Sequence, residues 1–195
     1  GDLNPLPRRK VALARQYGRT LSAAVEAVLA EPMRELSAEL HYTYKEIDLP
    51  LSPPAALEEL LKAQEQFSGY QKRWVTRQIV ILEKGGKLPS TYPFPLQIWR
   101  VGEQTMMMLG GEPVIEYAVK LKEIFGQDIF VLGYSNDVMA YIPSSSIINE
   151  GGYEGASSVM TTYLPNTWDT GIETIILSQM LDLAEEAGVV RHPVR

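Results

Sequence analysis

The sequence contains no cysteine among its 195 residues. This absence excludes disulfide bonds, cysteine nucleophiles and thiolate metal sites, although it leaves the cellular compartment open. Histidine is nearly as scarce, with one residue at position 41 and one at position 192. Neither has a second histidine at the spacing typical of zinc ligands. The residues therefore predict no zinc site built from the histidines of this chain alone.

Long apolar runs and excess positive charge are also lacking. Because no stretch of eighteen apolar residues occurs, the sequence predicts no membrane-spanning helix. The formal net charge of −6 argues against nucleic acid or an anionic membrane surface as the main partner. A lipid-like substrate held in a pocket stays compatible with this charge. Hydrophobic residues at 45% and charged residues at 22% are typical of one globular domain with a sizeable core.

The first ten residues read "GDLNPLPRRK". They include no initiator methionine and no apolar segment of the kind found in a signal peptide. We therefore expect the chain to begin within a longer protein, or at a processed or engineered boundary.

Hydrophobic periodicity predicts an alternation of helices and strands. Helices are expected at 8–30, from Ser52 as the N-cap, at about 69–83, from Pro113 to Gly126 and at about 170–187; strands are expected at 38–49, 96–101, 105–109 and 128–134. This order predicts an α+β (or α/β) fold in which helices pack on a mixed β-sheet. We expect residues 1–195 to form a single layered domain, with a helical insertion at about 52–86.

Four local expectations follow from the residue patterns in and around the strands. In the first strand, Tyr42 and Tyr44 have the opposite parity to Ile47 and Leu49, which makes a bulge near Lys45–Glu46 plausible. The proline-rich segment 88–95 is expected to form a loop. The run "TMMML" is apolar on both faces, so it predicts a central strand that forms a hairpin with "LQIWRV", while "DIFVLGY" predicts a buried strand.

Glu112 is the first candidate for chemistry. It follows Gly110 and Gly111 at a junction between a strand and a helix, where glycines let backbone approach closely. A carboxylate presented there suits a site at the end of a central strand. The simpler alternative is a glutamate that only stabilises the start of its helix.

The segment "YSNDVMAYIP" at 134–143 is the second candidate. Its Asn136 and Asp137 are typical turn formers that bond their own backbone. Tyr141 follows them, and by itself it could be an ordinary tyrosine with a satisfied hydroxyl. From these residues alone no reaction follows.

Taken together, several stretches resemble the neutral/alkaline ceramidases, and most closely the bacterial ceramidase-like branch. The stretches that carry the resemblance are "LGGEPVIEYAVKLK", "GYSNDVMAYIPSS" and "EGGYEGASS" in that order and spacing, together with "GDLNPLPR", "LPSTYPFPLQIWRVG" and the Trp168 region. They extend over nearly the whole chain, and their joint spacing is what is specific.

The resemblance implies a zinc-dependent amidase that hydrolyses the amide of ceramide. In that family one zinc ion is held by two histidines, a glutamate and a tyrosine. Glu112 occupies the position of the glutamate in its Gly-Gly-Glu turn, and Tyr141 lies five residues after Asn136, as the zinc tyrosine does. Tyr153, in "YEGAS", matches the tyrosine that supports the developing oxyanion. A serine hydroxyl completes the family's site.

Three departures from the family pattern shape the expectation. Both zinc histidines belong to an N-terminal part that we expect this chain to lack, so we predict weak or absent zinc binding and no activity for the isolated chain. In the serine motif, "GDLNP" places Asn4, whose amide can position a water molecule or donate a hydrogen bond but cannot be activated as a hydroxyl. This leaves the substrate open to a related amide or ester. Asp137 adds a carboxylate that is either a proton acceptor, a partner that orients the tyrosine, or a turn residue.

Two further hypotheses stand beside the hydrolase. One is a non-catalytic relative that binds a lipid or a glycan, and the other is a purely structural domain. If the N-terminal portion of the same domain is missing, we expect an exposed apolar surface or a homodimer interface. The resemblance also implies a periplasmic or extracellular location.

Overall fold

The computed structural model describes residues 9–191, and the chain divides after Leu36 into two units. In the first unit, helix α1 spans Val11–Leu29, close to the prediction of 8–30. None of its residues is buried. The apolar stripe of this helix, which includes Tyr17, Leu21, Val25 and Val28, is therefore exposed to solvent.

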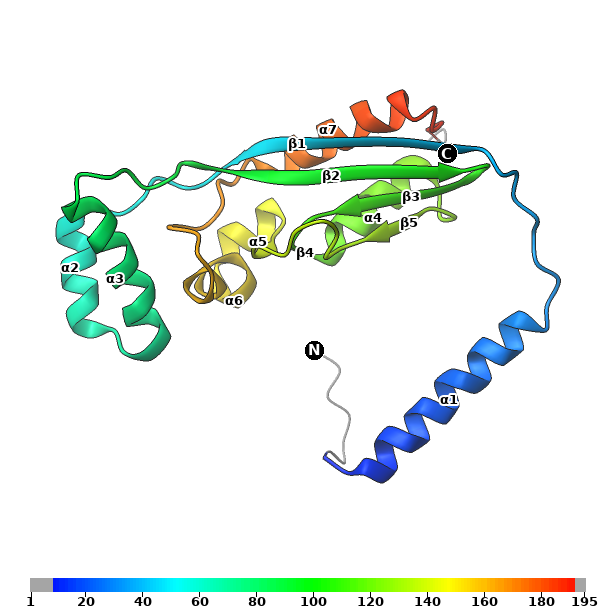
Figure 1. Cartoon of the computed structure of the whole chain (residues 1–195), viewed down its shortest axis with the longest axis horizontal. Coiled ribbons are helices and arrows are strands. Elements are labelled where there is room, and N and C mark those ends of the chain that lie inside the picture. Colours follow the sequence, from blue (N-terminus) through cyan, green and yellow to red (C-terminus); the bar gives the residue numbers. More distant parts are fainter. Residues whose placement is uncertain (1–8, 192–195) are drawn as a thin grey trace. The chain divides into compact units, whose positions relative to one another are not determined.

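The second unit is built on a four-stranded sheet with the order β1-β2-β3-β5 (Figure 1). Its strands are β1 (Leu40–Pro50), β2 (Thr91–Val101), β3 (Gln104–Leu109) and β5 (Phe130–Leu132). The first three pair antiparallel, and β5 pairs parallel to β3. The predicted α+β architecture with a mixed sheet is confirmed, as are the hairpin and the central place of β3.

The remaining elements of the second unit are helical segments and one short strand pair. The long helices are α2 (Leu57–Gln66), α3 (Gly69–Glu83), α4 (Ile115–Phe125) and α7 (Ile172–Glu186). The short ones are α5 (Ser145–Glu150), α6 (Gly152–Gly155) and the 3₁₀ helix η1 (Ser157–Thr161). Strands β4 (Glu112–Pro113) and β6 (Tyr141–Ile142) form a separate two-stranded sheet. Within residues 9–191, no helix has both the length and the hydrophobicity needed to cross a bilayer.

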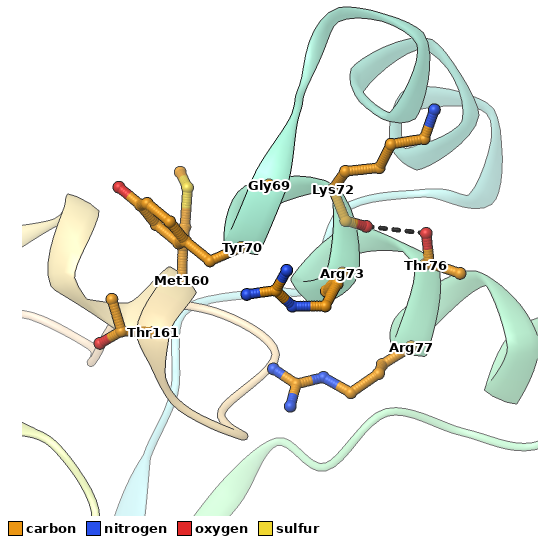
Figure 2. Close-up of a pocket in the computed structure, with 8 residues that line it drawn as sticks. All are labelled: Gly69, Tyr70, Lys72, Arg73, Thr76, Arg77, Met160 and Thr161. Carbon is orange, nitrogen blue, oxygen red and sulfur yellow. Dashed lines mark hydrogen bonds between the residues drawn. The ribbon is translucent and has the colours of Figure 1, made fainter.

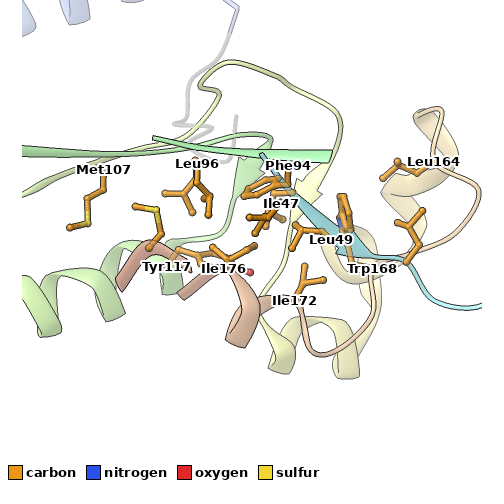
Figure 3. Packing of buried hydrophobic residues seen from close by; sticks show 14 of the residues in the cluster. Ile47, Leu49, Phe94, Leu96, Met107, Tyr117, Leu164, Trp168, Ile172 and Ile176 are labelled. Atoms are coloured by element: carbon orange, nitrogen blue, oxygen red, sulfur yellow. The ribbon is translucent and has the colours of Figure 1, made fainter. Parts of the chain in front are cut away.

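Helices α4 and α7 cover one face of the four-stranded sheet and close the core (Figure 3). Phe94 and Leu96 point from the sheet toward Tyr117 of α4 and Ile176 of α7, and all four side chains have essentially no exposure to solvent. Thr43 of β1 donates a hydrogen bond to the backbone carbonyl of Leu183 at 3.3 Å. Apolar burial on this face is thus the main source of the fold's stability.

The expected bulge in β1 is wrong. The strand pairs with β2 residue by residue over its whole length, from Leu40 opposite Val101 to Pro50 opposite Thr91. Ile47 and Leu49 face the core, whereas Tyr42 and Tyr44 lie on the opposite face and are exposed. The bulge was expected to turn both sets of apolar residues toward one core. The strand stays regular because the outer face of the sheet carries large apolar side chains as well.

The expected loop at 88–95 is also wrong, because strand β2 already begins at Thr91 and contains Pro93 and Pro95. The backbone carbonyl of Pro95 accepts a hydrogen bond from Gly110 at 3.2 Å. Pro95 lies just beyond the last β2–β3 pair, which is Leu96 opposite Leu109. Its carbonyl points away from β1, and its nitrogen does so too, because the nitrogen and the carbonyl of one strand residue point to the same side. Proline is tolerated in a strand where its missing N–H faces no partner.

Two further expectations are corrected. Strand β5 is an edge strand of three residues in which Phe130 and Leu132 are exposed, rather than a buried strand. Helix α2 begins at Leu57 with Ala56 as its N-cap, not at Ser52. The Ser52 hydroxyl instead donates to the backbone carbonyl of Trp168 at 3.0 Å. The carboxylate of Glu59 accepts a hydrogen bond from the Ala56 N–H at 3.0 Å, which satisfies one free donor at the helix start.

The outer face of the sheet carries a band of exposed apolar side chains, which we call the open sheet face. Directly paired residues point to the same side, so each row across the strands can be followed in the register. The open sheet face comprises the exposed residues Leu40, Tyr42, Tyr44, Trp99, Phe130 and Leu132 and the half-buried Met106. Tyr42 is 70% exposed and Phe130 is 58% exposed. Contiguous apolar surface of this kind marks an interaction surface.

Glu173 connects three helices on the covered side of the sheet. Its side chain, only 9% exposed, forms an ion pair with Lys120 of α4 and accepts a hydrogen bond from the Ser145 N–H at the start of α5 at 3.0 Å. Burial by itself would raise the pKa of the Glu173 carboxyl. The hydrogen bonds from Lys120 and Ser145 and the lysine charge outweigh burial and hold this pKa below the ordinary 4.5.

We expect Glu173→Gln to lower the free energy of unfolding at pH 7 by about 1–2 kcal/mol, because charge-assisted hydrogen bonds are lost. A lowered pKa in the folded state means that the carboxylate stabilises the protein above pH 4.5 and loses this effect as the pH falls through the folded pKa. Urea unfolding at several pH values should therefore show the two proteins converging at low pH. Glu185→Gln, an exposed change on the same helix, should alter neither value, and an equal effect of both variants would contradict the prediction.

Candidate functional site

Glu112 and Tyr141, 29 positions apart in the chain, are direct partners in the parallel pair of β4 and β6. The Glu112 N–H donates to the carbonyl of Ala140 at 2.8 Å, and the Val114 N–H donates to the carbonyl of Ile142 at 3.1 Å. Partners in register present their side chains on the same side of a sheet. This short pair therefore places a carboxylate beside a phenol. Glu112 lies in β4, two residues before the N-cap of α4, rather than in the first turn of that helix.

Gly111 makes the approach of the two strands possible. Its φ of +65° lies in the left-handed region, which only glycine adopts readily. A Cβ at this position would lie 2.7 Å from the Ala140 carbonyl oxygen and 2.6 Å from the Ile142 side chain. A hydrogen bond of 2.8 Å from the Gly111 N–H to the carbonyl of Asp137 fixes the same turn. The second glycine of "GGE" is thus required by space as well as by backbone conformation.

The phenol of Tyr141 thus lies beside the Glu112 carboxylate. Desolvation, followed by the negative charge of the Glu112 carboxylate, raises the pKa of Tyr141 from 10.0 to about 12. Each of these effects favours the neutral phenol over the phenolate. Both side chains are half-buried, so the carboxylate and the phenol form one partly desolvated pair.

Tyr153 adds a second phenol next to this pair. The rings of Tyr141 and Tyr153 meet edge to face, with centroids 5.7 Å apart and an interplanar angle of 72°. Tyr153 is 52% exposed, which leaves it open to a ligand. It lies in α6, which packs so tightly on α5 that a Cβ on Gly155 would come within 2.1 Å of the Ile147 carbonyl oxygen. The glycine in "YEGAS" therefore sets how closely the helix that carries Tyr153 can approach.

The loop between β5 and β6 is held by side chains from β2. Asn136 adopts a φ of +68° and donates its amide to the Gln97 side chain at 3.1 Å. One carboxylate oxygen of Asp137 accepts from the Tyr92 hydroxyl at 2.8 Å, and the other accepts from the Val138 N–H at 2.7 Å. Both oxygens of Asp137 are thus engaged in anchoring the loop.

Trp168 and Tyr92 are the residues that sequence reasoning missed as parts of the site. The indole N–H of Trp168 donates to the backbone carbonyl of Tyr141 at 2.8 Å and so holds strand β6 from behind. Its ring packs edge to face against Tyr92, with centroids 6.3 Å apart. No periodicity or motif indicated these contacts, because they join segments that are distant in the sequence.

The structure thus brings Gly111, Glu112, Tyr141 and Tyr153 together, with Asn136 and Asp137 in the adjoining loop. Asn4 lies outside the described residues. Among residues 9–191, no group of three or more His, Cys, Asp or Glu side chains is placed to hold a metal ion. Glu112 and Tyr141 can supply two oxygen ligands, one fewer than the three protein ligands of a typical catalytic zinc site.

We compared the chain with known families, curated proteins and solved structures. No family model matches the chain, and no curated protein matches it. Among solved structures, the chain is similar to one titled "Ceramidase complexed with C2", with a TM-score of 0.46 and 14% sequence identity. The match covers 93% of this chain and 35% of that ceramidase, so the chain spans about a third of its length. With a TM-score below 0.5, this similarity supports no inference about the fold or the function of the chain.

Gly111→Ala should destabilise the second unit. The strained φ alone costs roughly 1–3 kcal/mol, and the contact of the new Cβ with the Ala140 carbonyl oxygen adds to it. The matched control is Gly85→Ala, which has a similar φ of +76° but open space around the new Cβ. Chemical denaturation should show the larger loss at position 111, and equal losses would contradict the tight approach of β4 and β6.

Proposed function

We propose that this chain forms part of the active site of a zinc-dependent amidohydrolase that resembles neutral ceramidase and cleaves an N-acyl amide such as ceramide. The observation that carries the proposal is the pairing of Glu112 with Tyr141 in register, with the Tyr153 ring edge to face against the Tyr141 ring. These three residues occupy the positions that the sequence resemblance assigns to two zinc ligands and an oxyanion donor. Their proximity supports the assignment without depending on the structural comparison.

Each residue has a distinct role in this proposal. Glu112 and Tyr141 would hold the metal, and a bound zinc ion would supply Lewis-acid chemistry and a water of lowered pKa. The Tyr153 hydroxyl donates a hydrogen bond to the oxygen that becomes negative when the amide carbonyl is attacked. Asp137 positions the loop before Tyr141 through Tyr92. The predicted roles of Asn4 and of Asp137 as a proton acceptor stay predictions, as does the periplasmic or extracellular location.

The two-ligand site implies that further ligands come from protein outside the described residues. We propose that the polypeptide that supplies these ligands is a further part of the same hydrolase domain and that it covers the open sheet face. The face is continuous with the site, since Gln97, which binds Asn136, lies in the same row as Tyr44 and Leu132. A segment packed on the face would therefore reach the loop next to Tyr141. A homodimer through the same face is the alternative occupant.

The isolated chain should bind Zn²⁺ only weakly in calorimetric titration, because two protein ligands do not complete a zinc site. Glu112→Gln and Tyr141→Phe should each remove the residual binding, since the first replaces a charged carboxylate by a neutral amide and the second removes the phenol oxygen. Tyr163→Phe, at a tyrosine that is 91% exposed, is the control. Tight one-to-one binding would show that the site is complete in this chain, and binding unaffected by Glu112→Gln would exclude Glu112 as a ligand.

The open sheet face should make the isolated chain self-associate. Analytical ultracentrifugation of the chain and of Trp99→Lys should show association that the charged variant reduces, because Trp99 lies within the apolar band and is 42% exposed. Lys45→Gln, on the same strand pair, is the control. A wild-type chain that sediments as a monomer at all concentrations would contradict an uncovered interaction surface.

The intact gene product should hydrolyse N-acyl amides in a reaction that a zinc chelator abolishes. Tyr153→Phe should lower kcat by about 10²–10³-fold, as expected when one oxyanion donor is removed, with a smaller effect on KM. The Tyr163→Phe control should leave both constants unchanged. Absence of chelator-sensitive turnover on a panel of amides and esters would favour the non-catalytic lipid- or glycan-binding alternative.

A further inference from the structure

A hollow in the second unit shares no residue with the Glu112 site. It has a volume of about 690 Å³ and lies between the first half of α3 and η1 (Figure 2). Its lining residues are Gly69, Tyr70, Lys72, Arg73, Thr76, Arg77, Met160 and Thr161. The lining thus contains three basic residues and no acidic one, although the chain as a whole carries a net charge of −6.

Two of these basic residues direct their charges into the same space. Arg73 and Arg77 are one helical turn apart, and Figure 2 shows both guanidinium groups on the side of α3 that faces Met160 and Thr161, whereas the Lys72 side chain extends away. Like charges at this spacing on a helix repel each other. A bound anion would reverse this repulsion, so the pair fits an oxyanion ligand better than an empty surface.

Arg77 is oriented in advance for such a ligand. Its guanidinium donates a hydrogen bond to the backbone carbonyl of Thr162 and lies 4.6 Å from the centroid of the Tyr163 ring. A guanidinium has five N–H donors, so this arrangement leaves donors available. No hydrogen bond or ion pair within the described residues occupies the Arg73 side chain. One arginine is therefore fixed, and the other can close on the ligand.

The helix that carries both arginines adds to the positive potential. Helix α3 has 15 residues and begins at Gly69, on the wall of the hollow. Its N-cap, Ser68, makes no side-chain hydrogen bond to the first turn, and that turn contains no acidic residue. The free N–H groups of a helix start favour a nearby anion. They supplement the two arginines.

One edge of the hollow is lined by larger apolar groups. Tyr70 of α3, 48% exposed, and Met160 of η1 both extend to this edge (Figure 2). A ligand that contacts both the arginines and this edge must combine an oxyanion with a hydrocarbon part. Planar guanidinium groups bind phosphate oxygens in pairs, which favours a phosphate over a single charged point.

We propose that this hollow binds a phosphate monoester that carries an apolar group, with Arg73 and Arg77 on the phosphate and with Tyr70 and Met160 on the apolar group. The ligand chemistry could be provided by a free metabolite or by the headgroup of a phosphate-bearing lipid. The site is separate from the proposed hydrolase chemistry, and its test does not depend on that activity.

Titration of the full chain with n-hexyl phosphate, inorganic phosphate and n-hexanol, followed by NMR or calorimetry, tests the proposal. Hexyl phosphate should bind most tightly and hexanol should not bind. Arg73→Gln should weaken hexyl phosphate binding on the order of tenfold, as for loss of a bidentate charged contact, and Arg73→Lys should give an intermediate loss. Lys84→Gln, an exposed lysine at the other end of α3, should change nothing.

Vesicles of phosphatidylcholine with and without phosphatidic acid distinguish the two sources. Binding to phosphatidic acid vesicles that Arg73→Gln abolishes would identify a lipid headgroup as the source, and binding of hexyl phosphate without vesicle binding would identify a free ligand. Equal affinity of hexyl phosphate for the wild type and a folded Arg73→Gln variant, checked by circular dichroism, would overturn the proposal. Hexanol binding as tight as hexyl phosphate binding would also overturn it.

Discussion

The two-residue pairing of β4 with β6 is the contact on which the candidate site depends. It joins Glu112 to Tyr141 through backbone hydrogen bonds, and it exists only because Gly111 allows the strands to approach. A sheet of two residues has little stability of its own. It is held by neighbours, since Trp168 bonds the Tyr141 carbonyl and Asp137 fixes the preceding loop through Tyr92. The positions of Glu112 and Tyr141 therefore depend on these contacts with Trp168 and Tyr92.

The second unit is strongly asymmetric about its sheet. One face is closed by α4 and α7 over a core with almost no solvent exposure, while the open sheet face presents tyrosine, tryptophan and phenylalanine to solvent. This imbalance is unusual for an isolated antiparallel sheet, whose outer face is commonly polar. Gln97 binds Asn136, so this apolar surface borders the loop that precedes Tyr141.

Charge is arranged locally rather than evenly. The charge of the buried Glu173 carboxylate is balanced by Lys120 and by a backbone N–H, and these contacts connect α7 to α4 and α5. Arg73 and Arg77, by contrast, face a hollow without a carboxylate in its lining. Charges without a counter-charge that face the same hollow indicate where a ligand of the opposite sign would be stabilised, whereas the net charge of the chain does not locate such a site.

Much of the architecture could be predicted from the sequence, because helix periodicity and the hairpin pattern are local properties. The helices α1, α3, α4 and α7 fall close to their predicted ranges, and the mixed sheet and central β3 were expected. The errors arose where tertiary context overrides local preference. Prolines 93 and 95 fit a strand because their nitrogens face no partner, and the apolar parity of β1 reflects an uncovered face rather than a bulge.

For the site, the sequence by itself determined the identities and spacing of Glu112, Tyr141 and Tyr153, which are fixed by covalent order. Only the tertiary structure decided that the carboxylate and phenol lie side by side, that Tyr153 meets Tyr141 edge to face, and that Trp168 and Tyr92 hold this region in place. It likewise decided that Arg73 and Arg77 share a hollow with Met160. These contacts join residues far apart in the chain, and packing of the whole domain sets their distances.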